Sequence, residues 1–321
     1  MGEIAVRQAI LHGLVAAGAV EAALRAWRIR RADARLAFWL LALAFPFLVL
    51  PALLVAAPFR THDTFTAGWA LFSSDRWNAV RLAGLGIDTL VFALLVLSAT
   101  LLFLRDTVPF LVEAARERRK ESAAHAPPPD RLVALVQELA RRADAPAPAI
   151  TMLRTDASVM LVRGLIRPTL VVSEGALARL SDRQVRAALV HELAHVRFRD
   201  PLAGWLLMAA RLVMFWNPAV QLVCRAIVQE MEHRADQIAA RLDGPADLLT
   251  ALRALAPAGR ADRWSTGRPR RSIDIMVEHL HHAHMTARLA SLAQPQPALR
   301  FARTRLVLLA AALTATVFFV V

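Results

Sequence analysis

Long apolar runs separated by short polar segments dominate the first third of the chain. Residues 36–59 and 82–104 are each long and apolar enough to cross a bilayer as helices. Residues 4–27 follow a helical pattern interrupted by charges, so they either span the membrane or lie on its surface. A further apolar run covers residues 301–321. The pattern therefore predicts three or four transmembrane helices.

Between these runs the pattern changes to shorter elements. Residues 149–153, 159–162 and 169–172 are typical of short strands, and apolar positions after Asp130 recur with helical spacing. We therefore expect an α+β membrane protein. Its expected parts are an N-terminal transmembrane region, a mostly helical domain with a small β-sheet, and a last transmembrane helix, at residues 1–104, 105–300 and 301–321.

One predicted helix carries the strongest chemical signal. Ser181 and Gln184 have the spacing of a capping box, so a helix should begin there. His191 and His195 are four residues apart and leave the same face of that helix. Two such imidazoles can hold one Zn²⁺, and Glu192 beside the metal can take a proton from a zinc-bound water. The simpler alternative is a surface helix with two unrelated histidines.

A catalytic zinc needs three protein ligands, and a later segment offers candidates for the third. Glu232 and Asp236 share one helix face, so we expect Glu232 to bind the metal and Asp236 to accept a hydrogen bond from a ligand histidine. Asp200, just after the first helix, is another such acceptor. Glu230 and His233 are rival ligands on other faces. An ordinary charged amphipathic helix is the alternative.

Residues 202–226 are apolar enough to resemble another span, but the candidate zinc site argues against a single crossing. His191 and Glu232 must lie on the same side of the membrane, and two crossings need about forty residues, more than the interval provides. Arg211 and Pro218 also interrupt the run. We expect a helical hairpin that packs in the zinc-binding domain or dips into the membrane edge.

Taken together, these motifs resemble the membrane-embedded gluzincin metallopeptidases. The resemblance is carried by His-Glu-x-x-His at 191–195, Asp200, Asn217-Pro218, Glu-x-x-Ala-Asp at 232–236 and the segment 164–177. The BlaR/MecR-type antirepressor peptidases are the nearest group, with the HtpX/CAAX-protease type a close second. Ala235 favours the HtpX type, whereas the preceding spans and the run Phe215–Pro218 favour the BlaR/MecR type.

The resemblance implies a zincin-like domain in which the three candidate ligands hold one Zn²⁺ and Glu192 is the catalytic base. Its small sheet would bind a protein or peptide substrate as an extended strand. Arg288 loosely matches an arginine that would stabilise the transition state, although a salt bridge explains it equally well. The histidines between His279 and His284 are scattered around a helix, and their role stays open. BlaR/MecR receptors also carry an extracellular sensor domain, so here a separate sensor partner is one expectation.

The composition of the chain bears on whether its partners include nucleic acid or anionic lipid. The chain is 57% hydrophobic, with a formal net charge of +13. Basicity can indicate nucleic acid, but no nucleic-acid fold signature is present, so we expect none and assign the arginines to membrane orientation and anionic lipid. Basic flanks before 36–59 and after 82–104 place the zinc-binding domain on the cytoplasmic side of a bacterial-type inner membrane. The single cysteine, Cys224, excludes a disulfide framework and a cysteine-based zinc site.

The sequence thus predicts an integral membrane zinc metalloendopeptidase acting on cytoplasmic or membrane-proximal proteins. Regulated cleavage of a repressor or signalling protein is one use of such an enzyme. Quality control of membrane proteins, as in the HtpX type, is another. A zinc-bound sensor or scaffold without turnover is the non-enzymatic alternative.

Overall fold

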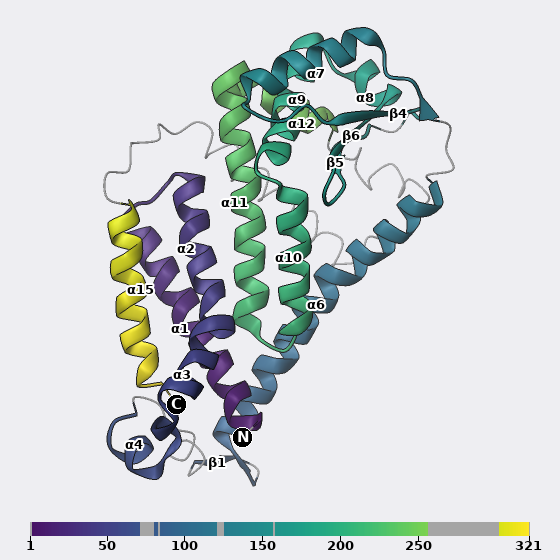
Figure 1. Ribbon diagram of the computed structural model, residues 1–321. Helices are drawn as coiled ribbons and strands as arrows, with labels where there is room; N and C mark the ends of the chain where they lie inside the picture. Colours follow the sequence, from purple (N-terminus) through teal and green to yellow (C-terminus); the bar gives the residue numbers. More distant parts are fainter. Residues whose placement is uncertain are drawn as a thin grey trace. The chain divides into compact units, whose positions relative to one another are not determined.

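The computed structural model describes residues 2–70, 80–82, 84–120, 125–156, 158–255 and 302–320, and its helices and strands are labelled in Figure 1. The chain divides into two compact units. The first consists of Met1–Ala115, Leu207–Glu230 and Pro297–Val321, and the second of Arg116–Leu206 and Met231–Gln296. Residues 207–230, which the sequence predicts to form part of a hairpin that packs in the zinc-binding domain or dips into the membrane edge, fall in the first unit.

The first unit is mainly helical. Its elements are α1 (Gly2–Ala26), α2 (Ala32–Ala44), a π-helix (Phe45–Val49), α3 (Leu50–Ala56), a 3-10 helix (Pro58–Thr61), α4 (Asp63–Gly68), strands β1 (Arg81–Leu82) and β2 (Leu85–Gly86), most of α6 (Ile87–Lys120) and α15 (Ala302–Phe318). Pro46 lies in the π-helix, where its missing N–H removes one bond of the regular ladder. The helical run continues through Pro46 and Pro51, and its α-helix ends at Ala56, ahead of Pro58 and short of the predicted end at residue 59.

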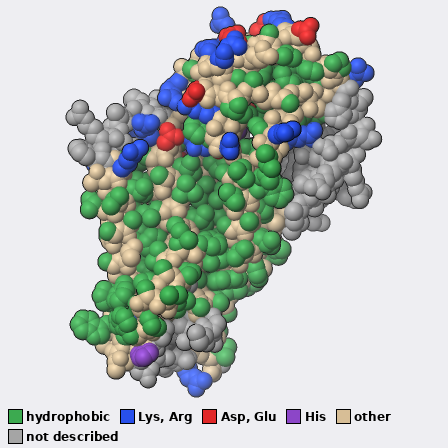
Figure 2. Space-filling view, in the orientation of Figure 1, with side chains coloured by type: hydrophobic (Ala, Val, Ile, Leu, Met, Phe, Trp, Pro, Cys, Tyr) green, Lys and Arg blue, Asp and Glu red, His purple; other side chains and the backbone are tan. Residues whose placement is uncertain are grey.

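Three segments of this unit are long and apolar enough to cross a membrane: Ala5–Ala26, Ala32–Ala56 and Ile87–Thr107. Helix α15, with 17 residues, is shorter. Helix α1 packs against α2 and α15 (Figure 1). Many large apolar side chains remain exposed on these helices, among them Leu48, Val55, Leu94 and Leu308, and Figure 2 shows hydrophobic side chains spread over the visible face of this unit. Exposed apolar surface of this extent is what a lipid bilayer covers.

Helices α10 (Asp200–Val213) and α11 (Pro218–Asp243) form a hairpin, and each contributes residues to both units. Asn217 lies in the turn between them. Its side-chain oxygen accepts a hydrogen bond from the backbone N–H of Ala219 at 3.0 Å, which caps α11. Its side-chain amide donates to the backbone carbonyl of Ala9 at 2.9 Å. The turn is thereby fixed to α1.

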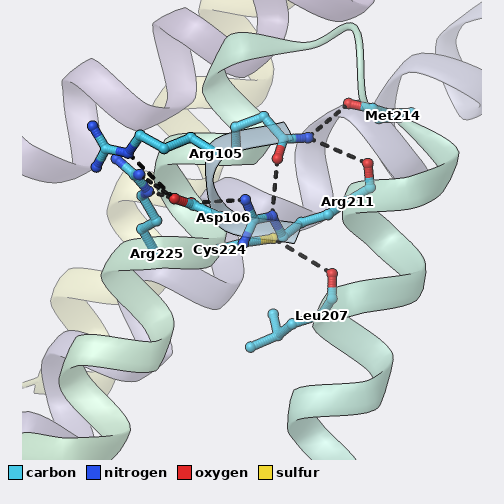
Figure 3. Close-up of polar contacts among 8 residues, drawn as sticks. Arg105, Asp106, Leu207, Arg211, Met214, Cys224 and Arg225 are labelled. Carbon is cyan, nitrogen blue, oxygen red and sulfur yellow. Dashed lines mark hydrogen bonds and ion pairs between the residues drawn. The ribbon is translucent and has the colours of Figure 1, made fainter. Parts of the chain in front are cut away.

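A second polar contact joins this hairpin to α6. Asp106 accepts hydrogen bonds from two arginines, Arg225 on α11 and Arg211 on α10 (Figure 3). Arg211 also donates to the side chain of Gln221, which in turn donates to backbone carbonyls of α10 and of the turn. Because Asp106 lies within a segment long and apolar enough to cross a membrane, its charge needs partners there.

The second unit contains a four-stranded sheet. Its strands are β3 (His125–Ala126), β4 (Ala149–Leu153), β5 (Met160–Arg163) and β6 (Thr169–Ser173), in the order β3-β4-β6-β5. β4 and β6 are parallel, whereas β5 runs antiparallel to β6 at the edge of the sheet. The three longer strands confirm those predicted from the sequence to within one residue.

The helices of this unit are α7 (Asp130–Arg142), α8 (Glu174–Arg179), α9 (Asp182–Arg197), α12 (Pro245–Leu255) and the ends of α10 and α11. Helix α9 packs against α7, α12 and β5. Leu189 and Leu193 of α9 are fully buried with Leu139, Leu170 and Leu248. The expectation of a mostly helical membrane protein with a small sheet is confirmed.

Candidate metal centre

Helix α9 begins where its sequence predicts. Ser181 and Gln184 form both hydrogen bonds of the capping box, which fixes the first turn. Three turns later, His191 and His195 project from one face. Their Nε2 atoms lie 3.2 Å apart. His191 is buried and His195 nearly so, which places both imidazoles away from bulk solvent.

Glu232 of α11 completes a group of three. Its carboxylate oxygens lie 3.7 Å from His191 Nε2 and 3.6 Å from His195 Nε2. One ligand atom from each residue lies within 4.8 Å of the others. Of the rival ligands, Glu230 instead pairs with Arg35 at 2.5 Å, and neither Glu230 nor His233 belongs to this group.

Each histidine contacts a carboxylate through its other ring nitrogen. His191 Nδ1 lies 3.0 Å from Asp236 Oδ1, and His195 Nδ1 lies 2.8 Å from Asp200 Oδ2. Both carboxylates are buried. The His195–Asp200 contact is a hydrogen bond, and an Nδ1–H that donates to Asp200 leaves the Nε2 lone pair of His195 available. The His191–Asp236 contact is an ion-pair contact without hydrogen-bond geometry.

These distances fit a tetrahedral metal. Ligand atoms at about 2.0–2.1 Å from a tetrahedral zinc lie about 3.3–3.4 Å from one another. The observed separations of 3.2, 3.6 and 3.7 Å are close to that value. Two bare Nε2 lone pairs at 3.2 Å would repel, so a proton or a cation must lie between them. The donor set of two imidazoles and one carboxylate, without sulfur, suits zinc.

The charge around the histidines also favours a cation. Burial lowers the pKa of His195, but its hydrogen bond to Asp200 and the charges of Glu232 and Glu192 outweigh burial and raise that pKa to about 9. Four carboxylates lie in this part of the unit: Glu192, Asp200, Glu232 and Asp236. A divalent ion offsets this excess of negative charge.

Glu192 lies beside the three candidate ligands. Burial raises the pKa of its carboxyl above the usual value, partly opposed by the two histidines. The backbone N–H of Val162, in edge strand β5, donates a hydrogen bond to this carboxylate. A carboxylate beside the candidate ligands is in a position to accept a proton, as a general base requires.

Two hydrogen-bond donors to the carboxylates of the site were not predicted from the sequence. One is the backbone amide of Val162, which donates to Glu192, and the other is Arg234, which donates to Asp200 at 2.6 Å. Arg234 looks like any charged residue of an amphipathic helix, and no spacing rule singles it out. Two other predicted features, Arg288 and the histidines between His279 and His284, lie outside the described residues.

Comparison with known proteins finds similarity to membrane peptidases. Residues 81–243, half of the chain, match the family model "BlaR1 peptidase M56", and this range contains all the residues of the site. The chain is 30% identical over 168 residues to a "Protease HtpX homolog" of Methylibium petroleiphilum, covering 42% of this chain and 57% of that protein. It is 31% identical over 151 residues to the homologue from Burkholderia cenocepacia, covering 37% and 53%.

The chain thus spans about half the length of the curated relatives that it matches. Among solved structures, the crystal structure of S. mikatae Ste24p aligns over 77% of this chain and 74% of that one, with 15% identity and a TM-score of 0.34. The family model covers the three apposed side chains, both supporting carboxylates and Glu192, and on this match the chain belongs to the BlaR1 peptidase M56 family.

Proposed function

We propose that this protein is an integral membrane zinc metalloendopeptidase. The observation that carries the proposal is the convergence of His191, His195 and Glu232, whose ligand atoms lie within 4.8 Å of one another in the spacing of a tetrahedral zinc site. Membership of a peptidase family supports the reaction class. Asp200 and Asp236 orient the two histidines and keep their Nε2 atoms available.

The chemistry of the site follows from these groups. Zinc bound there supplies Lewis acidity, which polarises a carbonyl and acidifies water. Glu192 would take a proton from the attacking water, whose oxygen bonds to the carbonyl carbon, and would pass that proton to the nitrogen as the C–N bond breaks, which gives a carboxylic acid and an amine. Arg288 is a candidate to stabilise the oxyanion, on the strength of the family resemblance alone.

The substrate class follows from strand β5. Within the described sheet β5 is an edge strand, so one side of its backbone has no partner strand. The hydrogen bond from Val162 to Glu192 places this edge next to the catalytic carboxylate. A polypeptide that adds to β5 as an extended strand would therefore pass beside Glu192.

The setting of the reaction is proposed from the charge pattern. Basic residues precede the span Ala32–Ala56 and follow the span Ile87–Thr107, which by the positive-inside rule puts both flanks and the catalytic domain in the cytoplasm of a bacterial-type inner membrane. We propose that the catalytic domain covers residues 105–300 and that a last membrane helix covers residues 301–321. Substrates are then cytoplasmic or membrane-proximal proteins, and nucleic acid is not a partner.

Two physiological uses compete. The family match favours cleavage of a repressor or signalling protein, with a separate sensor as a possible partner. The similarity to proteins named "Protease HtpX homolog" favours quality control of membrane proteins. A repressor gene beside the gene of this protein would favour the first use, and heat-induced expression would favour the second.

The test is Glu192→Gln in the full-length protein, which removes the base and leaves the ligands in place. We expect one zinc per chain to remain and cleavage of an unfolded protein substrate to stop. Glu174→Gln, at an exposed position of α8, is the matched control and should cleave normally. Undiminished cleavage by Glu192→Gln would refute the proposed mechanism. If cells keep their phenotype with Glu192→Gln, the zinc-bound scaffold is the better description.

A further inference from the structure

Arg234 contacts Asp200, the carboxylate that supports the candidate ligand His195. Its guanidinium Nη2 donates a hydrogen bond to Asp200 Oδ1 at 2.6 Å. The other oxygen of Asp200 lies 2.8 Å from His195 Nδ1. The two oxygens of this carboxylate are thus divided between an arginine and a candidate metal ligand. Both side chains are nearly inaccessible to solvent, at 11% exposure for Arg234 and 5% for Asp200.

A second contact holds the guanidinium itself in place. Its central carbon lies 3.7 Å from the ring centroid of Phe198, well within the range of a cation–π interaction. Phe198 is the C-cap residue of α9, and the following Arg199 has a φ of 54°, so the chain turns sharply before Asp200 begins α10. Arg234 therefore contacts this turn both at its start and at its end.

The sequence position of Arg234 adds to this role. It lies on α11 between Glu232 and Asp236, the residues that contact His195 and His191. Through Asp200 it also reaches His195 from the opposite side. One arginine thus connects the helix that carries the candidate carboxylate ligand with the turn that supports a candidate histidine ligand.

The physical consequence concerns the orientation of Asp200. A carboxylate fixed by a charge-assisted hydrogen bond cannot rotate freely, so its second oxygen stays aimed at the imidazole N–H. Without the guanidinium, Asp200 would be a buried anion with one fewer partner, free to turn away from His195. Loss of supporting carboxylate contacts of this kind typically lowers metal affinity about 10–100-fold.

We propose that Arg234 is a positioning residue of the metal centre: it orients Asp200, and through Asp200 it orients His195 for metal binding. This inference rests on the proposed function, because it assumes that His195 binds zinc. Arg234 is not one of the three candidate metal ligands, and its effect should therefore be seen in metal affinity and ligand geometry before it is seen in turnover.

The experiment compares four full-length proteins purified in detergent: wild type, Arg234→Gln, Arg234→Lys and Arg241→Gln. Zinc affinity is measured by competition with a chromophoric chelator, and the visible absorption spectrum of the Co²⁺-substituted protein reports ligand geometry. Arg241 is the matched control, because it is exposed and lies two turns further along α11. We expect Arg234→Gln to weaken zinc binding at least tenfold and to change the Co²⁺ spectrum. Arg234→Lys should recover part of the affinity, and Arg241→Gln should behave as wild type.

A double-mutant cycle with Asp200→Asn separates positioning from general destabilisation. If Arg234 acts through Asp200, adding Arg234→Gln to Asp200→Asn should weaken zinc binding less than twofold further. Should Arg234→Gln not fold, Arg234→Lys takes its place in the cycle. Wild-type affinity and an unchanged Co²⁺ spectrum in the Arg234 variant would overturn the inference, as would full additivity in the cycle. A wild-type chain that takes up no zinc would instead contradict the proposed function itself.

Discussion

Replacing Asp106 by Asn tests how the α10–α11 hairpin is held to α6. Asp106 accepts hydrogen bonds from both Arg211 and Arg225, and the three side chains are only 19%, 12% and 26% exposed, respectively (Figure 3). Removing one partner of a buried ion pair costs about 3–5 kcal/mol. Because the three side chains keep some exposure and Asn still accepts one hydrogen bond, we expect a loss of about 2–3 kcal/mol.

The assay is unfolding of the full-length protein by sodium dodecyl sulfate in mild detergent, followed by tryptophan fluorescence. Glu21→Gln is the control. It breaks the pair between Glu21 and Arg25, which are 36% and 78% exposed, and should cost at most about 1 kcal/mol. Replacing Asp106, Arg211 and Arg225 together by apolar residues of similar size should recover most of the loss, because the cost lies in the unpaired charges. If Asp106→Asn costs no more than the control, the cluster does not hold the hairpin.

Two further predictions concern the metal centre. Asp236→Asn keeps the shape of the side chain but removes the charge that supports His191, so zinc affinity measured by chelator competition should fall about 10–100-fold; a change below threefold would contradict the supporting role. Adding zinc at a hundred times its dissociation constant should stabilise the metal-free protein by about 2.7 kcal/mol. At about 2–4 °C per kcal/mol, its thermal midpoint should then rise by about 5–10 °C. Glu232→Ala should abolish this rise, and an equal rise in that variant would show that zinc binds elsewhere.

Sequence patterns were sufficient to predict features whose residues lie close together in the chain. The capping box at Ser181 and Gln184 depends on residues three apart, and the common face of His191 and His195 depends only on the helical period. Both features could therefore be predicted from the sequence. The long apolar runs likewise indicate membrane helices by length alone.

Features that depend on how helices face one another could not be predicted in the same way. The spacing of Glu232 and Asp236 favours Glu232 over the rival ligands Glu230 and His233, but spacing does not fix the rotation of α11 about its axis. In the structure Glu232 meets the histidines, and Glu230 pairs with Arg35. The link from Arg234 to Asp200 joins residues 34 positions apart through tertiary packing. The grouping of 207–230 with the first unit also follows from packing, because an apolar run fits either a membrane or a protein core.

The most direct test of the metal centre is zinc-edge X-ray absorption on the purified full-length protein, together with its metal content. We predict one zinc per chain, surrounded by nitrogen and oxygen at about 2.0–2.2 Å with no sulfur. His191→Ala and His195→Ala should each lose the metal. A wild-type protein that retains no zinc would contradict the account. So would histidine variants that keep zinc in the same surroundings as the wild type.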